Sequence, residues 1–175
     1  MPAPRKGAWR AQAADRLVPD ASVAFKWHIA NEPDTARAVA VLAAYTAGDL
    51  ALVAPDHFRY EVPAALRAAT RRRPPRLSRE QADQAVAEFL GFAIPTVTDD
   101  ALVTDALAVS FSNDCGFYDA LYVALAHRLG IPFLTADAKL YQQVRQLPDV
   151  LWLGDWQTGS SEAVYIVQSR AHQRN

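Results

Sequence analysis

The chain has 175 residues, of which 51% are hydrophobic and 21% charged, and a formal net charge of −1. This length predicts one domain with a sizeable core. The near-zero net charge excludes a global attraction to nucleic acid or membrane, so any affinity for a polyanion must come from local clusters of basic residues. The single cysteine, Cys115, excludes an internal disulfide, is typical of a reducing compartment, and is expected to be a small buried apolar residue.

Residues 1–15 are polar and mildly basic, which predicts a flexible N-terminal extension. They lack the apolar segment of a signal peptide, and the chain nowhere approaches the roughly 18 consecutive apolar residues of a membrane span. We therefore expect a cytoplasmic protein with a folded domain over 16–156. Residues 157–175 form an irregular tail, in which the VYIV run (164–167) would pair with a sheet edge or a partner, or stay disordered.

Short apolar strands alternate with helical patterns through the first half of the domain. In chain order we expect a strand over 16–20, a helix over 34–47, a strand over 50–55 and a helix over 56–70. Gly48 ends the first of these helices. Two prolines disturb the pattern: Pro19 cannot donate to a central ladder, and Pro63 implies a kink or a broken first turn in its helix.

The second half continues this alternation. In chain order we expect a basic, proline-rich loop over 71–78, a helix through 89, a strand over 94–98, helices over 101–111 and 118–129, a strand over 131–137, a helix over 138–146 and a strand over 150–153. Ser78 and Gln81 form a capping box, Asp99 or Asp100 caps the following helix, and Gly130 ends the helix after the SNDCG loop. The alternation predicts an α/β fold with a mostly parallel sheet covered on both faces.

Four acidic residues lie in apolar surroundings, in the segments LVPDASVAF, FRYEVPAAL, GFYDALYVALA and FLTADAKLY. They are Asp20, Glu61, Asp119 and Asp137. Isolated carboxylates are costly to bury unless they are paired or bind a metal, and ligands of parallel sheets bind outside the carboxyl ends of the strands. The pattern therefore predicts one acidic pocket that holds a divalent cation.

Each of these acids also has a local interpretation. Asp119 is suited to the first turn of a helix, Asp137 to capping the helix that follows it, Asp20 to starting a turn, and Glu61 to a solvated helix face. Tyr118 and Tyr122, which flank Asp119 on the same helix, are expected in the core and not as base-stacking residues. It is less plausible that all four acids have only local roles than that they share one site.

Three segments carry a family resemblance: DASVAFKW (20–27), APDHFRYEVPAAL (54–66) and FYDALYVALAHRLGIPFLTAD (117–137). Together they resemble a PIN domain, and within that family the VapC-type toxin nucleases of bacterial toxin–antitoxin pairs. The resemblance extends over about residues 17–155. It implies a parallel, three-layer α/β/α sandwich. The chain departs from the family pattern at Pro19 and Pro63, which puts local geometry in doubt but not the identity of the acids.

The resemblance also implies a chemistry, which is Mg²⁺- or Mn²⁺-dependent hydrolysis of RNA to products with 5′-phosphate and 3′-hydroxyl ends. The implied catalytic residues are the four acids, Asp20, Glu61, Asp119 and Asp137. Asp20, Asp119 and Asp137 are assigned mainly to the metal, and Glu61 either binds it or orients the attacking water. Ser22 and Thr135 match positions that support the site by hydrogen bonding.

A basic rim is needed to hold a polyanion beside acids. The basic candidates are Lys26, Arg67, Arg71, Arg72, Arg73 and Arg76, and phosphate contacts of this kind give affinity without sequence information. A solvated loop that only aids solubility is an equal alternative for the arginines. The resemblance implies a small antitoxin partner and a homodimer.

Three other functions stay open at this point. They are a PIN-like nuclease that processes RNA outside toxin–antitoxin systems, a non-catalytic PIN-like module that binds nucleic acid or protein, and an aspartyl-phosphate phosphotransfer protein. The last would need a second acid beside Asp20 or a lysine on a late strand, whereas Ala, Ser and Val follow Asp20, and Lys139 lies on a helix.

Overall fold

The computed structural model describes residues 15–156. The strands are β1 (Asp15–Pro19), β2 (Leu50–Leu52), β3 (Ala54–Pro55), β4 (Thr96–Val97), β5 (Phe133–Thr135) and β6 (Val150–Trp152). The helices are α1 (Ala21–Phe25), α2 (Thr35–Ala47), α3 (Phe58–Ala69), α4 (Arg79–Gly91), α5 (Asp100–Asn113), α6 (Phe117–Leu129), α7 (Ala138–Val144) and the 3₁₀ turn η1 (Leu153–Asp155). No helix in this range is long and apolar enough to cross a membrane. The VYIV run lies outside the described residues.

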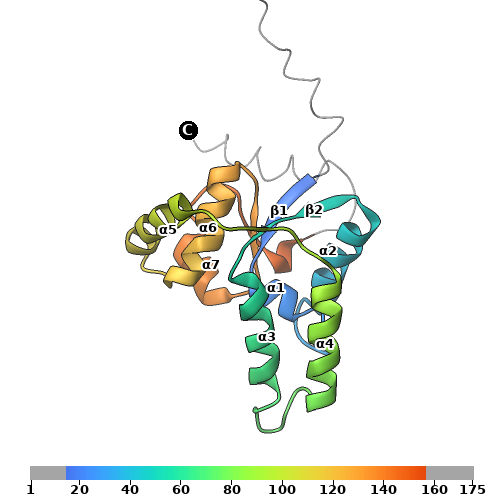
Figure 1. Cartoon of the computed structure of the whole chain (residues 1–175). Coiled ribbons are helices and arrows are strands. Elements are labelled where there is room, and N and C mark those ends of the chain that lie inside the picture. The colour runs from blue at the N-terminus through green and yellow to red at the C-terminus, as the bar shows by residue number, and fades with distance from the viewer. Residues whose placement is uncertain (1–14, 157–175) are drawn as a thin grey trace, which may run out of the picture.

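The central sheet has the order β2-β1-β5-β6, and all its pairs are parallel. Neighbouring residues of the two middle strands belong to different core clusters: Leu17 and Leu134 pack in one, Val18 and Phe133 in the other. Since successive side chains of a strand point to opposite faces, the sheet has a hydrophobic core on both faces. The expected parallel α/β sandwich is thereby confirmed (Figure 1).

Two expectations about strands need correction. The strand expected over 50–55 is divided into β2 and β3, and β3 leaves the main sheet to pair with β4 in a separate two-stranded sheet. Pro19 does lie in a central strand, but β2 ends opposite Leu17. Toward β5, the N–H groups of Val18 and Asp20 make the hydrogen bonds. The N–H that Pro19 lacks is thus not among those that join β1 to β5, and the pairing of β1 with β2 has ended before Pro19.

The helices follow their local signals with two differences. Ser78 and Gln81 form the expected capping box of α4, and Asp99, not Asp100, caps α5. The short helix α1 was not expected from the sequence. Pro63 neither breaks α3 nor ends it, because burial of one apolar face of α3, including Phe58, Val62 and Leu66, stabilises the helix around the missing hydrogen bond.

Helices α3 and α4 lie side by side and extend away from the sheet as a hairpin (Figure 1). The basic loop over 71–78 forms the free end of this hairpin. Helices α5 and α6 pack against each other beside the sheet, and Tyr122 of α6 contacts Phe58 and Glu61 of α3. Cys115, between them, is free and buried, as expected of a small apolar residue.

Candidate active site

Asp20 lies at the carboxyl end of β1, where the chain turns into α1. Its side chain is the N-cap of α1 and accepts a hydrogen bond from the N–H of Val23 at 3.1 Å. The hydroxyl of Ser22 donates to Oδ1 at 2.5 Å, and the hydroxyl of Thr135 donates to Oδ2 at 2.5 Å. Asp20 is only 4% exposed, so three donors hold an almost fully buried carboxylate in one orientation.

Ser22 and Thr135 also connect Asp20 to the adjacent strand end. The N–H of Ala136 donates to the hydroxyl of Ser22, and the N–H of Asp137 donates to the hydroxyl of Thr135, each at 2.9 Å. Each hydroxyl thus accepts from the backbone after β5 and donates to Asp20. The two residues expected to support the site lie in contact with it.

Burial raises the pKa of Asp20 from 3.8 to about 7. The hydrogen bonds from Ser22, Thr135 and the N–H of Val23 act in the opposite direction, and the negative charge of Glu61 adds to the increase. Burial therefore has the largest effect. The carboxylate at the end of β1 is destabilised unless a proton or a cation neutralises it.

Asp137 follows β5 and is the N-cap of α7. One oxygen, Oδ1, accepts the N–H groups of Lys139 and Leu140 at 2.8 and 3.0 Å. Among the described residues, no group donates to Oδ2. Because β1 and β5 are adjacent parallel strands, Asp20 and Asp137 follow strands that end at the same edge of the sheet, as expected. Unlike Asp20, however, Asp137 is exposed, so its apolar sequence neighbours do not bury it.

Glu61 lies in the first turn of α3 and faces α6. The hydroxyl of Tyr122 donates to its Oε2 at 2.6 Å, and Nε2 of His57 lies 3.4 Å from the same oxygen. Burial favours the neutral acid, but the close polar contact and charge of His57 and the hydrogen bond of Tyr122 outweigh it and lower the pKa of Glu61. Glu61 is thus held as a carboxylate.

Asp119 lies in the first turn of α6, close to the N-cap residue Gly116. An ideal Cβ at position 116 would lie 2.8 Å from Oδ2 of Asp119, so a side chain there would require Asp119 to move. Burial raises the pKa of Asp119, and the charges of Glu61 and Asp137 raise it further. These repulsions, with that between Glu61 and Asp20, connect the four acids into one electrostatic group.

Oxygen donors of this kind suit a hard divalent cation. Oε1 of Glu61, Oδ2 of Asp137 and both oxygens of Asp119 accept no hydrogen bond from the described residues and are available as ligands or as contacts to water. Within 15–156, however, no three His, Cys, Asp or Glu side chains converge closely enough to hold a metal ion. The donors fit Mg²⁺ or Mn²⁺ by chemistry, whereas their present spacing forms no closed coordination shell.

The acids lie at an open edge of the fold. Two surface cavities, of about 380 and 350 Å³, lie elsewhere: the first is lined by residues 29–33 and Arg76, and the second lies between α3 and α4 around Phe58 and Phe89. Neither includes any of the four acids.

Lys26 and Arg76 are committed to ion pairs. Nζ of Lys26 lies 3.1 Å from Oε2 of Glu32 and donates to the carbonyl of Pro33 at 3.0 Å. Arg76 pairs with the other oxygen of Glu32. Both cations are thus partly neutralised.

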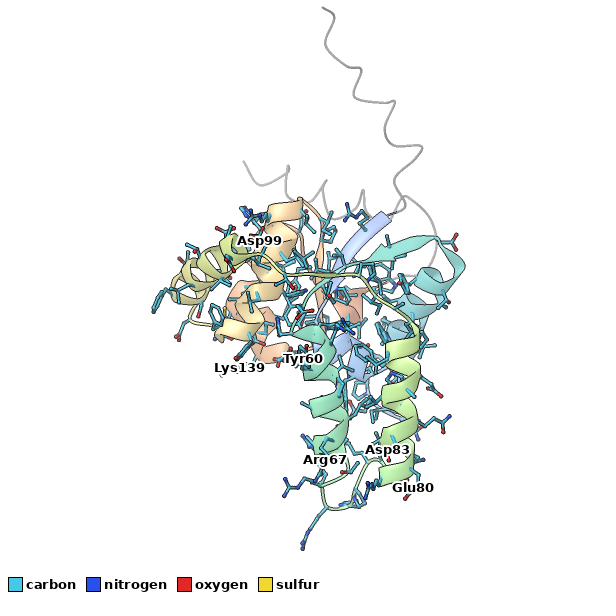
Figure 2. The ribbon with its side chains drawn as sticks, in the orientation of Figure 1. Tyr60, Arg67, Glu80, Asp83, Asp99 and Lys139 are labelled. Atoms are coloured by element: carbon cyan, nitrogen blue, oxygen red, sulfur yellow. The ribbon has the colours of Figure 1, made fainter. Side chains whose placement is uncertain are left out.

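The other arginines are exposed at the free end of the α3–α4 hairpin. Figure 2 shows Arg67 near this end, whereas Tyr60, the neighbour of Glu61, lies where α3 joins the body. From the helical rise of 1.5 Å per residue, residues 71–73 lie about 15 Å from Glu61. At this distance their side chains do not reach the acids.

One expectation about the aromatic residues is wrong. Tyr122 is buried, as expected, but Tyr118 is 65% exposed. Burial on α6 begins at Ala120, so the first turn, which carries Tyr118 and Asp119, lies at the surface. Tyr118 contacts the ring of His57, with 5.5 Å between the ring centres, and it adds an accessible aromatic surface beside the acids.

Two residues of the site were missed in the sequence. His57 precedes Glu61 by four residues, the spacing that brings two side chains together on one helical turn, and this signal was available. The positive charge of Lys139 lowers the pKa of Asp119, and the place of Lys139 after Asp137 gave no indication of an electrostatic effect on α6.

The comparisons agree with this geometry. A family model described as PIN domain matches residues 17–145. The protein PAE2754 from Pyrobaculum aerophilum is 19% identical, with a TM-score of 0.58, and the match covers 92% of this chain and 100% of that one. VapC20 of Mycobacterium tuberculosis, described as a sarcin–ricin loop cleaving toxin, is 17% identical, with a TM-score of 0.53 and coverage of 72% and 93%. No curated protein matches the chain.

Proposed function

The chain belongs to the PIN domain family, and on this premise we propose that it is a Mg²⁺- or Mn²⁺-dependent endoribonuclease. PIN domains are generally nucleases. The observation that carries the proposal is that all four acids fall within the matched residues, that the charge of Glu61 raises the pKa of Asp20, and that the charges of Glu61 and Asp137 raise the pKa of Asp119. A nuclease site of this type needs such a group of carboxylates, whereas a purely structural role does not.

The residues would divide the chemistry between them. Asp20, Asp119 and Asp137 would hold the cation, which when bound activates water and neutralises charge on the phosphate. Glu61, whose pKa is lowered, is ionised at neutral pH and orients the attacking water or accepts its proton. Ser22 and Thr135 fix the orientation of Asp20. The products would carry 5′-phosphate and 3′-hydroxyl ends.

The test is incubation of the purified protein with RNA in Mg²⁺ or Mn²⁺, with and without EDTA. Asp20→Asn and Asp119→Asn should each abolish cleavage. Asp83→Asn is the matched control, because Asp83 is an exposed acid of α4 whose loss should leave the rate unchanged. Cleavage that persists in EDTA and in both site variants would show that the site is assigned wrongly.

A role as the toxin of a toxin–antitoxin pair is the finer proposal. It is supported by the fold shared with VapC20, which is described as a toxin, and it includes a small antitoxin as partner and a homodimer as the working form. Expression of the chain should arrest growth, and coexpression of a small protein encoded next to it should relieve the arrest. Light scattering after size exclusion measures the dimer.

Two alternatives are separated by the same experiments. A nuclease that processes RNA would cleave RNA in Mg²⁺ without arresting growth. A non-catalytic module would bind RNA but would neither cleave it nor bind Mn²⁺ in calorimetry. The present spacing of the carboxylates, with no closed metal shell in residues 15–156, is the observation that keeps the second alternative.

A further inference from the structure

Two side chains from different parts of the fold meet the same oxygen of Glu61. Tyr122, in the middle of α6, donates its hydroxyl to Oε2 at 2.6 Å. His57, the residue before α3, places Nε2 3.4 Å from that oxygen. No described residue donates to Oε1. One oxygen of the carboxylate is therefore engaged and the other is left available.

The position of the Tyr122 hydroxyl is fixed by the core. Tyr122 is 1% exposed, and its ring packs against Phe58 of α3 and Phe133 of β5, with 6.3 and 6.4 Å between the ring centres. Burial and the negative charge of Glu61 raise the pKa of Tyr122 far above its ordinary value. The phenol therefore keeps its proton and remains a donor at every physiological pH.

His57 is held from the side by aromatic contacts. Its ring centre lies 4.7 Å from that of Tyr122 and 5.5 Å from that of Tyr118. Nε2 of His57 is buried and has no hydrogen bond of ordinary geometry within the described range. A buried polar nitrogen without a partner destabilises the fold. The contact of Nε2 of His57 with Oε2 of Glu61 compensates for part of this loss.

We propose that His57 and Tyr122 are positioning residues, which hold Oε2 of Glu61 so that Oε1 faces the reacting groups. The proposal rests on the proposed nuclease function and deepens it. Both act through Glu61. The charge of Glu61 raises the pKa of Asp20 and of Asp119, so Glu61 belongs to the same electrostatic group as these acids.

The experiment uses variants that remove a donor and keep the volume. Tyr122→Phe removes only the hydroxyl, and His57→Phe keeps an aromatic ring, whereas His57→Gln restores an N–H donor. The matched control is Tyr45→Phe, since the hydroxyl of Tyr45 donates to the carbonyl of Phe92 far from the acids. Thermal unfolding of each variant confirms that it folds.

Two readouts are measured. The first is RNA cleavage: Tyr122→Phe and His57→Phe should lower kcat about tenfold to a hundredfold, which is the range for a hydrogen bond to a charged group, with KM nearly unchanged. His57→Gln should recover most of the lost rate. The second is a ¹³C NMR titration of the Glu61 carboxyl in the metal-free protein, in which loss of either donor should raise the pKa of Glu61.

The outcomes separate the two proposals. Wild-type kcat in both Tyr122→Phe and His57→Phe, or an unchanged pKa of Glu61 in both, overturns the positioning role. An equal loss of rate in Tyr45→Phe also overturns it, because the effect would then be general. If the wild-type protein cleaves no RNA, the proposed function fails, and the NMR titration alone decides whether these residues hold Glu61.

Discussion

Asp20→Asn should make the metal-free protein more stable at alkaline pH, although it removes a residue of the site. Burial raises the pKa of Asp20 to about 7, so the folded protein holds a carboxylate that would prefer to be neutral. Asparagine is nearly isosteric, is as good an N-cap as aspartate, and has no charge to bury. The substitution therefore removes the cost of burying the charge and preserves the turn from β1 into α1.

The size and sign of the effect follow from linkage. A folded pKa raised from 3.8 to about 7 corresponds to ~4 kcal/mol of lost stability once both states are ionised. The loss is absent well below pH 3.8, where the group is protonated in the folded and the unfolded protein alike, is still small at pH 4, and grows as the pH rises toward 7. Above pH 8 it is complete, so the variant should exceed the wild type there by ~2–4 kcal/mol.

Urea unfolding in EDTA at pH 4, 6 and 8 measures this difference. The free energies of unfolding of the two proteins should be similar at pH 4 and should separate progressively above it. Addition of Mn²⁺ at pH 8 should then stabilise the wild type more than the variant, because ligand binding to the folded state adds stability. A variant less stable than the wild type at pH 8 without metal would refute the reasoning.

Three further predictions concern neighbouring parts of the fold. Thr135→Val should remove a buried donor to Asp20 and lower the free energy of unfolding, measured in urea, by ~1–3 kcal/mol. In this variant the pKa of Asp20, measured by NMR, should rise. Substitution of arginines 71–73 by alanine should weaken RNA binding uniformly across sequences and reduce its dependence on salt concentration. If the salt dependence is unchanged, the loop is a solvated surface that does not bind RNA. Ser78→Ala should cost about 1 kcal/mol through loss of the capping box, whereas the exposed Ser112→Ala should cost less.

Features encoded by local signals were predictable from the sequence. The Ser78–Gln81 capping box, the stop at Gly130 and the alternation of strands and helices depend on residues within a few positions of one another. Asp20 and Asp137 were placed correctly because the carboxyl ends of adjacent parallel strands must share an edge. The family resemblance added Ser22 and Thr135, whose contacts with Asp20 no local pattern indicates.

Features that depend on tertiary packing were not predictable. Pro63 lies within an unbroken helix because the apolar face of α3 is buried, and burial was not measurable from one segment. Tyr118 and Tyr122 lie four residues apart on α6, yet only Tyr122 is buried, because the packing against α3 and β5 begins one turn after Tyr118. The role of His57 required the same approach of α3 to α6.

The local and the functional interpretations of Asp20 and Asp137 are compatible. Each aspartate caps a helix, and the cap fixes its orientation: Oδ1 of Asp137 accepts two backbone N–H groups while Oδ2 accepts none from the described residues. A strand that ends at the sheet edge and a helix that begins there bring the capping acid to the position where a ligand binds. Capping thus preorganises the site. It follows that alanine substitutions at these positions would remove both the cap and the charge, whereas asparagine keeps a capping oxygen and removes the charge, at Asp20 together with one acceptor of a hydroxyl hydrogen bond.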